Sequence, residues 1–510
     1  MATPRVVVVG AGMGGLAAAA DLARAGAAVT VVERAASCGG KMRQIMAGGA
    51  PIDAGPTVFT MRWIFEGLFG DAGERLNDHL DLVAATTLAR HAWRSGGTLD
   101  LFADIARSAD AIGAFAGPEE ARGYLAFCAR SKDIYGTLVR DFIAAERPSV
   151  AGLVARLGPA RMPDLWRTMP MRTLWSALGD HFRDPRLRQL FGRYATYVGA
   201  SPWSAPATLM LIAHVEQDGV WLVRGGIHQV AQAIRNLAQR QGAQFRFGAG
   251  MDRIVIERGR VAGVVLDNGE RLEADAVVYN GDISALTAQE RPVPATPPAA
   301  RSLSAVTWCL SARTAGFDLA HHNVFFAEDY ANEFRSIFRD RRITAAPTVY
   351  LCAQDRGEGS AHQAGAPERL LALINAPADG DQAPLDEAAI ADLAGRAFGV
   401  MASCGLTITP VEAPTVTTPS GFEALFPATG GALYGRANHG MMGSFARAGA
   451  AGKVPGLYLA GGSVHPGPGI PMATMSGRIA AARLLADWTG GAGRRRTVRI
   501  PVGRPVGRPG

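Results

Sequence analysis

The sequence lacks the features that identify several common classes of protein. Its five cysteines are spread over 510 residues and form no CxxC pair, which argues against a disulfide framework or a zinc site and favours a reducing compartment. No run of 18 uncharged apolar residues occurs, so a membrane-spanning helix is not expected. There is also no metal-binding constellation, GxSxG motif or Cys/His pair, and we predict no metal site.

Acidic residues are missing from the C-terminal end, where basic charge accumulates. The chain carries a formal net charge of +7, and residues 493–510 (GRRRTVRIPVGRPVGRPG) contain six arginines and no acid. The Pro/Gly content predicts a disordered tail over 491–510. No aromatic residues alternate with these arginines, so nucleic-acid binding is not expected. The rest of the chain is too long for one core, and we expect two or three domains.

A strand–turn–helix–strand pattern at the N-terminus predicts a dinucleotide site. Val6–Val9 is an unbroken β-branched run, typical of a buried parallel strand. The glycines of Gly10–Gly15 follow at once and open an Ala/Leu-rich helix that extends to about residue 25. A second buried strand, Val29–Val32, ends at Glu33. This context makes the GxGxxG spacing informative.

Each residue type has a physical reason to stand where it does. Gly10 permits the tight turn, Gly12 lets the backbone approach a pyrophosphate, and Gly15 lets the helix pack on the strand. The N-terminus of the helix offers free N–H groups and a positive dipole end to the phosphates. Glu33 can accept both ribose hydroxyls, and its charge disfavours the 2′-phosphate of NADP.

Three further segments favour FAD over NAD. Ser37–Lys41 brings two glycines and a cation toward the phosphates, and Ile52–Thr57 offers another close backbone approach. Far away in the chain, a short strand over Gly456–Ala460 leads into the loop Gly461–Pro471 and then a helix from about Met472. A second helix N-terminus at the same site suits the N1/C2 carbonyl edge of a reduced flavin.

The predicted FAD-binding residues come from all of these segments: Gly10, Gly12, Gly14, Gly15, Glu33, Arg34, Gly39, Gly40, Lys41, Gly55, Pro56, Thr57, Asp282, Gly461, Gly462, Gly469, Ile470, Pro471 and Met472. His465, in the C-terminal loop, is the one acid–base candidate. Its alternative role is a hydrogen bond that makes the loop rigid. Asp53 and Asp282 flank glycines and are expected to be structural residues or cofactor ligands.

The middle of the chain is predicted to complete the FAD domain. A helix from Arg224 to Arg240 precedes a group of short strands: Gln244–Phe247, Asp252–Glu257, Val261–Leu266, Arg271–Glu273 and Ala276–Tyr279. We therefore expect a discontinuous α/β FAD-binding domain made of residues 1–60, 220–284 and 436–490.

Residues 61–219 and 285–435 are expected to form a second, α+β domain that binds substrate. Apolar spacing in the first block predicts helices over Leu101–Phe115, Glu119–Phe142 and Pro185–Val198. The second block contains predicted strands over Ala305–Leu310, Thr348–Leu351 and Leu370–Asn375, and a predicted helix over Asp386–Phe398.

Four stretches at both ends and in the middle resemble one family: VVVVGAGMGGLAAAADLARAGAAVTVVERAASCGGKMRQI, PIDAGPTVFTM, LVRGGIHQVAQAI and LYLAGGSVHPGPGIPMATMSGRIAA. The chain resembles the bacterial carotenoid desaturases of the phytoene desaturase type, among the amine-oxidase-like flavoproteins with a Rossmann-like FAD domain. Within them it is most similar to the 1-hydroxycarotenoid 3,4-desaturases of purple bacteria. Lys41 stands where relatives often carry Arg, and Met472 where many carry Gly.

The resemblance implies FAD-dependent insertion of a C-3,4 double bond into a 1-hydroxycarotenoid such as 1-hydroxyneurosporene. One hydrogen leaves as hydride to flavin N5 and the other as a proton, with no acid or base identified. The electron acceptor, oxygen or a quinone, stays open. Alternatives are a phytoene desaturase or isomerase acting on unhydroxylated chains, an amine oxidase, and a flavin-free lipid-carrying adaptor.

Segment Arg161–Phe182 combines tryptophans and other apolar residues with arginines, as a helix lying in a membrane interface does. The alternative is an ordinary helix pair broken at Pro170 and packed on the core. Because a polyene substrate resides in the bilayer, the resemblance implies a cytoplasmic protein held peripherally on the inner (chromatophore) membrane.

Overall fold

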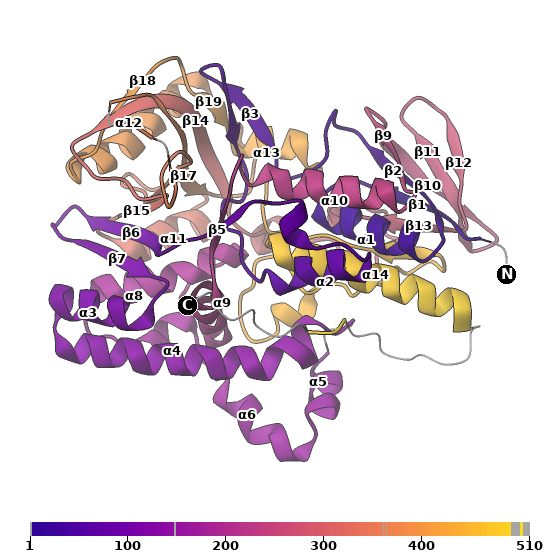
Figure 1. The fold of residues 1–510 in the computed structure, drawn as a ribbon, viewed down its shortest axis with the longest axis horizontal. Helices are drawn as coiled ribbons and strands as arrows, with labels where there is room; N and C mark the ends of the chain where they lie inside the picture. The colour runs from indigo at the N-terminus through magenta and orange to yellow at the C-terminus, as the bar shows by residue number, and fades with distance from the viewer. Residues whose placement is uncertain (1–2, 147–148, 361, 364, 491–499, 503–510) are drawn as a thin grey trace.

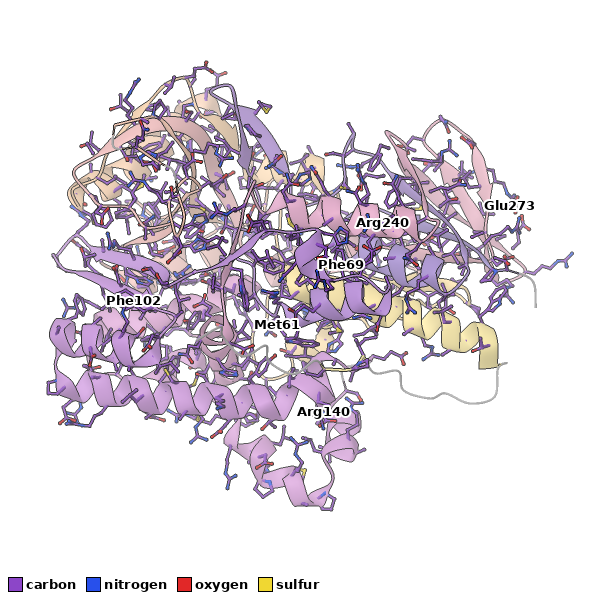
Figure 2. The ribbon with its side chains drawn as sticks, viewed as in Figure 1. Met61, Phe69, Phe102, Arg140, Arg240 and Glu273 are labelled. Atoms are coloured by element: carbon purple, nitrogen blue, oxygen red, sulfur yellow. The ribbon has the colours of Figure 1, made fainter. Side chains whose placement is uncertain are left out.

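The computed structural model describes residues 3–146, 149–360, 362–363, 365–490 and 500–502. A five-stranded and an eight-stranded sheet lie side by side, and a layer of helices runs beneath the eight-stranded one (Figure 1). In Figure 2, Glu273 and Phe102 mark opposite ends of the molecule, and Met61 lies between the two halves. The predicted tail lies outside the described residues except for 500–502, where the N–H of Ile500 donates to the carbonyl of Ala144 at 3.2 Å.

The first sheet is parallel and has five strands in the order β20-β13-β1-β2-β9. Its strands are β1 (Arg5–Val9), β2 (Ala28–Glu33), β9 (Gln244–Phe247), β13 (Ala276–Tyr279) and β20 (Leu457–Leu459). Segments from the N-terminus, middle and C-terminus thus pair in one sheet, with Val7 opposite Val277 and Val277 opposite Leu457. Strands buried on both faces explain the unbroken apolar runs in the sequence.

Alternate residues of β1 pack into different cores. Val6 and Val8 face α1 (Met13–Arg24), α10 (His228–Arg240) and α14 (Ile470–Gly490), whereas Val7 and Val9 face the antiparallel sheet β10-β11-β12. The three strands of that sheet are Met251–Glu257, Arg260–Leu266 and Arg271–Glu273. Within the helical layer, the buried guanidinium of Arg478 on α14 pairs with Asp21 on α1 at 3.0 Å.

The second sheet has eight strands, in the order β18-β14-β17-β16-β15-β6-β7 with β19 also paired to β14. Its strands are β6 (Thr87–Trp93), β7 (Thr98–Phe102), β14 (Ser304–Ala315), β15 (His322–Phe326), β16 (Val349–Ala353), β17 (Glu368–Ala376), β18 (Thr407–Pro410) and β19 (Thr415–Thr417). Helix α12 (Glu387–Ser403) covers one face. Strand β6, from the first block, runs parallel to β15 from the second, so both blocks build this sheet.

Several helices lie along the other side of this sheet, among them α3 (Ile105–Ala116), α4 (Pro118–Leu138, continued by a π-helical turn to Ile143), α8 (Pro185–Gly192), α9 (Leu211–Asp218) and α11 (Tyr330–Phe338). The predicted helix over Leu101–Phe115 was wrong at its start. Residues 98–102 pair with β6, and the helix begins only after Asp104, whose carboxylate accepts the N–H of Arg107 at 3.0 Å.

Two further predicted helices differ from the observed ones. The helix expected from Arg224 begins at His228, because the residues before it form a turn after β8 (Trp221–Val223). Segment Arg161–Phe182 is not one helix but α6 (Met162–Arg167) and α7 (Leu174–Leu178), separated by a stretch that includes Pro170. Proline has no N–H to continue the helical ladder and restricts the residue before it, which explains the break.

All five cysteines are unpaired. Among the described helices, none combines the length and the apolar character that a membrane span requires.

Candidate functional site

A cavity of about 820 Å³ begins at the carboxyl ends of β1, β2 and β13 and extends to one face of the eight-stranded sheet. Its lining includes every predicted cofactor residue except Gly15. Carboxyl ends of parallel strands are where open α/β sheets bind ligands. The cavity therefore joins the predicted dinucleotide site to the second half of the molecule.

The glycines at the start of the cavity form a backbone cradle. Gly10 has φ 95°, in the left-handed region, and its N–H donates to Val32 at 2.8 Å. Gly39 pairs with Gly12 in a parallel bridge, and a Cβ on Gly40 would lie only 3.2 Å from the Cα of Gly12. The two glycine-rich segments are therefore in contact through their backbones. This agrees with the prediction that both approach the same phosphates.

Asn280 holds this turn in place, and it was not among the residues predicted from the sequence. Its Nδ2 donates to the carbonyl of Gly10 at 3.1 Å. A Cβ on Gly14 would lie 2.6 Å from Asn280 Oδ1 and 2.7 Å from the N atom of Gly461, so only glycine fits where the two chain ends meet. The sequence feature that could have identified Asn280 is its position directly after β13, the strand that pairs with β1.

Glu33 is buried at the end of β2 and holds the turn with both oxygens. Oε2 accepts the N–H of Ala11 at 2.7 Å, and Oε1 accepts that of Ala35 at 2.9 Å. Gly15, the predicted residue outside the lining, packs inside the turn, where a Cβ would be 2.0 Å from the carbonyl of Gly10. Arg34 donates to the carbonyl of Ala424 at 2.6 Å.

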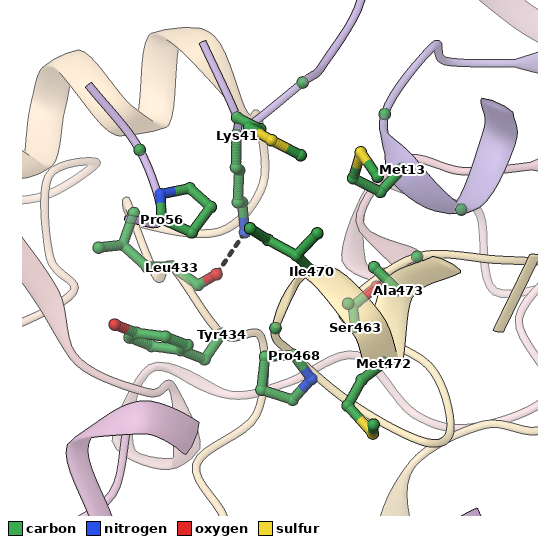
Figure 3. A pocket seen from close by; sticks show the side chains of 18 of the residues that line it. Met13, Lys41, Pro56, Leu433, Tyr434, Ser463, Pro468, Ile470, Met472 and Ala473 are labelled. Carbon is green, nitrogen blue, oxygen red and sulfur yellow. Dashed lines mark hydrogen bonds between the residues drawn. The ribbon is translucent and has the colours of Figure 1, made fainter. Parts of the chain in front are cut away.

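Lys41 and Arg447 bring positive charge to the cofactor end of the cavity. Lys41 Nζ donates to the carbonyl of Leu433 at 2.6 Å (Figure 3), and burial lowers the pKa of this amine although Asp282 opposes the shift. Arg447 donates to the carbonyls of Gly462 and Tyr434, both at 3.0 Å, and burial lowers its pKa to about 10. Within the described residues neither forms an ion pair, so an anionic ligand in the cavity would meet uncompensated positive charge.

The C-terminal loop contributes the opposite wall. Gly469 and the first residues of α14, Ile470 to Met472, line the cavity, and Figure 3 places Ile470, Pro468 and Met472 around it near Lys41 and Pro56. Ser476 fixes the loop, because its Oγ accepts the N–H of Gly461 at 2.7 Å. A second helix N-terminus thus reaches the cavity, as the sequence predicted.

The remaining candidates have structural partners. Asp53 Oδ2 accepts the N–H of Ile227 at 2.7 Å at the start of α10, and Asp282 Oδ1 accepts that of Ser284 at 2.9 Å. His465 lies behind the cavity wall, where its Nε2 is 2.9 Å from the carbonyl of Phe142, and burial lowers its pKa to about 4. This geometry matches the loop-stabilising role that was the alternative for His465.

The far end of the cavity is a mostly apolar surface with a few polar groups. Thr307, Leu373, Tyr350 and Val324 form one row across strands β14, β17, β16 and β15, and all four line it. Tyr350 Oη lies 2.6 Å from Thr57 Oγ1, which links the sheet to the predicted cofactor segment. Residues from α4 and α9, including Leu138 and Val215, complete the wall.

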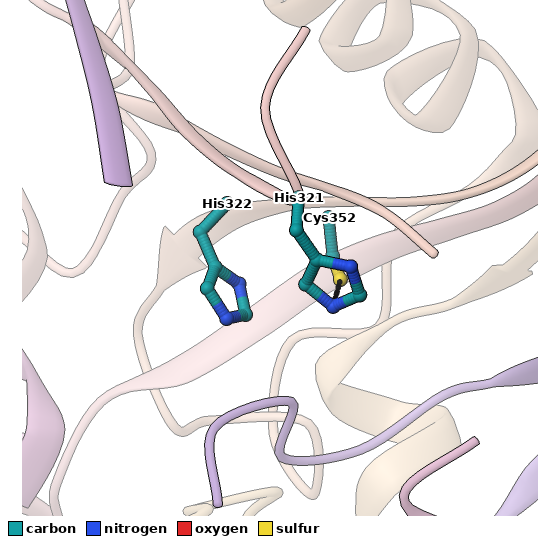
Figure 4. A group of neighbouring side chains, drawn as sticks. All are labelled: His321, His322 and Cys352. Atoms are coloured by element: carbon teal, nitrogen blue, oxygen red, sulfur yellow. Dashed lines mark hydrogen bonds between the residues drawn. The ribbon is translucent and has the colours of Figure 1, made fainter. Parts of the chain in front are cut away.

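One buried cluster was not foreseen from the sequence. The pairing of β15 with β16 brings His321, His322 and Cys352 together (Figure 4). One atom of each, of a kind that can bind a metal ion, lies within 4.8 Å of the other two. His321 Nε2 lies 3.5 Å from Cys352 Sγ, while His322 Nδ1 lies 2.7 Å from the hydroxyl of Tyr350. The cluster thereby fixes Tyr350 at the cavity wall.

Comparison with known proteins agrees with this site. The profile of the family described as "Flavin containing amine oxidoreductase" matches residues 13–485. The solved structure of putrescine oxidase aligns with TM-score 0.60 at 18% identity, covering 95% of this chain and 99% of its own. That likeness shows a shared fold. Together with the dinucleotide cradle, the family makes this chain a flavoprotein oxidoreductase whose cofactor is FAD.

The relatives narrow the class. A hydroxyneurosporene desaturase of Rubrivivax gelatinosus is 54% identical over 507 residues, covering 97% of this chain and 96% of its own. Another from Cereibacter sphaeroides is 44% identical, covering 95% and 98%. The chain belongs to the flavin-containing amine oxidoreductases and, within them, to the carotenoid desaturases.

Proposed function

We propose that this protein introduces the C-3,4 double bond into a 1-hydroxycarotenoid such as 1-hydroxyneurosporene during carotenoid biosynthesis. The observation that carries the proposal is the single cavity that joins the glycine cradle to a long, mostly apolar wall. A linear polyene matches such a wall, and the names of the relatives above match the reaction.

The cofactor site consists of the glycines and cations described above. Gly10, Gly12 and Glu33 would hold the ADP half, and Lys41 and Arg447 would offset the negative charge of the cofactor. When bound, FAD supplies a hydride acceptor at N5. Gly55 to Thr57 and Gly469 to Met472 border the reacting end. The FAD-binding domain comprises 1–60, 220–284 and 436–490, and residues 61–219 and 285–435 form the substrate domain.

The chain acts chiefly by positioning the polyene and excluding water. Leu371 and Leu373 on the sheet, with Leu138 and Val215 on the helices, provide apolar walls for it. Holding the C3–C4 bond against the flavin converts a bimolecular encounter into an oriented one. A dry cavity also protects the electron-deficient carbons from attack by water as the hydride leaves. The second hydrogen leaves as a proton, for which no residue is assigned.

The protein also associates peripherally with a membrane, through α5 (Val150–Leu157) and α6. These helices project from the body below α4 (Figure 1). Three apolar side chains at this projection are exposed: Val150 (41%), Trp166 (66%) and Met171 (70%). Arg161 and Arg167 lie among them, in the pattern of an interfacial anchor.

Replacing Trp166 and Met171 by Ser should reduce pelleting with anionic liposomes, whereas undiminished pelleting would rule this surface out.

The desaturase proposal is tested by mixing the oxidised holoenzyme with liposomes containing 1-hydroxyneurosporene in the absence of oxygen. We expect the flavin absorbance near 450 nm to bleach with one equivalent of carotenoid, because the hydride has no other destination. Empty liposomes are the control. Oxidised flavin that persists with the bound carotenoid would contradict the proposal.

A further inference from the structure

A buried hydroxyl without a hydrogen-bond partner belongs to a residue at the sheet end of the cavity. Tyr330, at the start of α11, lines the cavity and is 5% exposed, and its buried Oη has no hydrogen-bond partner in the part of the chain that the structure describes. Edge-on contacts with Phe334 (5.0 Å) and Phe326 (6.0 Å) hold the ring in place. Buried polar groups are nearly always paired, so this one points to a ligand.

A buried guanidinium lies in the same region. Arg193 lines the cavity and donates to Tyr197 Oη at 2.9 Å, and Tyr197 in turn donates to Glu216 at 2.8 Å. Burial opposes the charge on Arg193, but Tyr197 and Glu216 outweigh it and raise its pKa, so the group is a permanent cation. Among the described residues Tyr197 is the one hydrogen-bond partner of the guanidinium, which leaves further N–H donors for a ligand in the cavity.

These two groups line the same cavity as Gly55 to Thr57, the segment that would border the reacting end of the cofactor. Arg193 is within electrostatic reach of Tyr330 and of Tyr350. Tyr350 is hydrogen-bonded to Thr57, two residues after Gly55. In a 1-hydroxycarotenoid the oxygen sits on C1, and one carbon separates C1 from the reacting C3. A group that recognises this oxygen must therefore lie in the same cavity as the hydride acceptor, and Tyr330 and Arg193 both line that cavity.

We propose that Tyr330 and Arg193 bind the C1 hydroxyl of the substrate and select hydroxylated over unhydroxylated carotenoids. Both groups can donate to the hydroxyl oxygen, which has two lone pairs. An unhydroxylated chain would bury both donors without a partner, and a site built to bind a hydroxyl discriminates strongly against an analogue that lacks it. This inference rests on the proposed desaturase function and names its specificity determinants.

The test compares kcat/KM for 1-hydroxyneurosporene and neurosporene in liposomes, using the FAD-loaded full-length protein. Tyr330→Phe removes only the unpaired oxygen. We expect it to lower kcat/KM for the hydroxylated carotenoid about 10- to 100-fold, mainly through KM, and not to lower kcat/KM for neurosporene, so that the preference for the hydroxylated chain falls. Tyr135→Phe, which removes the hydroxyl of a half-buried tyrosine outside the cavity lining, is the control and should keep the wild-type ratio. Arg193→Met should reduce the ratio as well.

The outcomes separate the two proposals. If the wild type prefers the hydroxylated carotenoid and Tyr330→Phe keeps that preference with full flavin content, the hydroxyl-binding role is overturned while the desaturase function stands. If the wild type desaturates neither carotenoid, the proposed function fails and this inference fails with it. Quenching of the protein's fluorescence by each carotenoid measures binding directly and gives a second readout. In this assay Tyr330→Phe should weaken binding of the hydroxylated carotenoid only.

Discussion

Replacing Gly12 by Val should abolish tight FAD binding. A Cβ at this position would lie 2.9 Å from Nδ2 of Asn280, closer than such contacts allow. Asn280 would have to move and would weaken its hydrogen bond to Gly10, which is 3.1 Å long. The two methyl groups of valine would then occupy space where backbone N–H groups meet a pyrophosphate.

The size of the effect follows from the bonds that are lost. Hydrogen bonds to a charged phosphate contribute about 1.5–3 kcal/mol each. Displacing the pyrophosphate from two backbone donors therefore costs about 3–6 kcal/mol, or roughly 10²- to 10⁴-fold in Kd. Gly10 and Gly39 on either side keep their own conformations, so the fold should persist.

The assay is titration of the deflavinated protein with FAD, followed by the quenching of flavin fluorescence. Gly395→Val is the matched control, because a Cβ there meets nothing within 4 Å and the residue lies on the exposed side of α12. Circular dichroism establishes that both variants are folded. A Gly12→Val protein that binds FAD as tightly as the control would refute the placement of the pyrophosphate.

Three other substitutions test the site and its frame. Glu33→Ala should weaken FAD binding by about 1–3 kcal/mol through lost charge-assisted hydrogen bonds, and an unchanged Kd would exclude the predicted ribose contact. Arg478→Met removes the closer of the two cations that pair with the buried Asp21, at 3.0 Å, and leaves only Arg24 at 3.6 Å. It should lower the free energy of unfolding in urea titrations, by less than the roughly 3–5 kcal/mol expected for a buried charge left with no partner. Because the pKa of His465 falls from 6.5 to about 4 in the folded state, the unfolded chain takes up the proton first. Stability should therefore decline as the pH drops from 6.5 to 4, and His465→Gln should decline less steeply over that window.

The sequence allowed the parallel sheet and its cofactor end to be predicted in detail. Gly10, Gly12 and Glu33 follow from local chemistry, since a strand, a tight turn and a helix N-terminus are contiguous in the chain. Strand Ala276–Tyr279 was predicted with the observed ends, because a fully buried parallel strand leaves an unbroken apolar run.

Contacts between distant segments were harder to predict. Asn280 bonds to Gly10 across 270 positions, and nothing in its local sequence reveals which turn it reaches. The Lys41 amine was expected near the phosphates, but whether a four-carbon stem reaches them or the carbonyl of Leu433 depends on packing that the sequence does not display.

The spacing of apolar residues also gave a wrong prediction where the same pattern is compatible with both a helix and a strand. Leu101 and Phe102 extend a helical spacing into α3, yet they belong to a strand because β6 is available to pair with them. Tyr330 and Arg193 carry no motif at all. Their relevance comes from the cavity, which exists only once the sheet and the helical layer are assembled.

The central claim is tested most directly by the carotenoid product. The FAD-loaded protein is incubated with 1-hydroxyneurosporene or neurosporene in liposomes, with an electron acceptor supplied, and the visible spectrum is followed over time. A red shift that is much faster with the hydroxylated carotenoid than with neurosporene is the predicted result, because one new double bond lengthens the conjugated system. No shift with either carotenoid, despite bound flavin, would contradict the account.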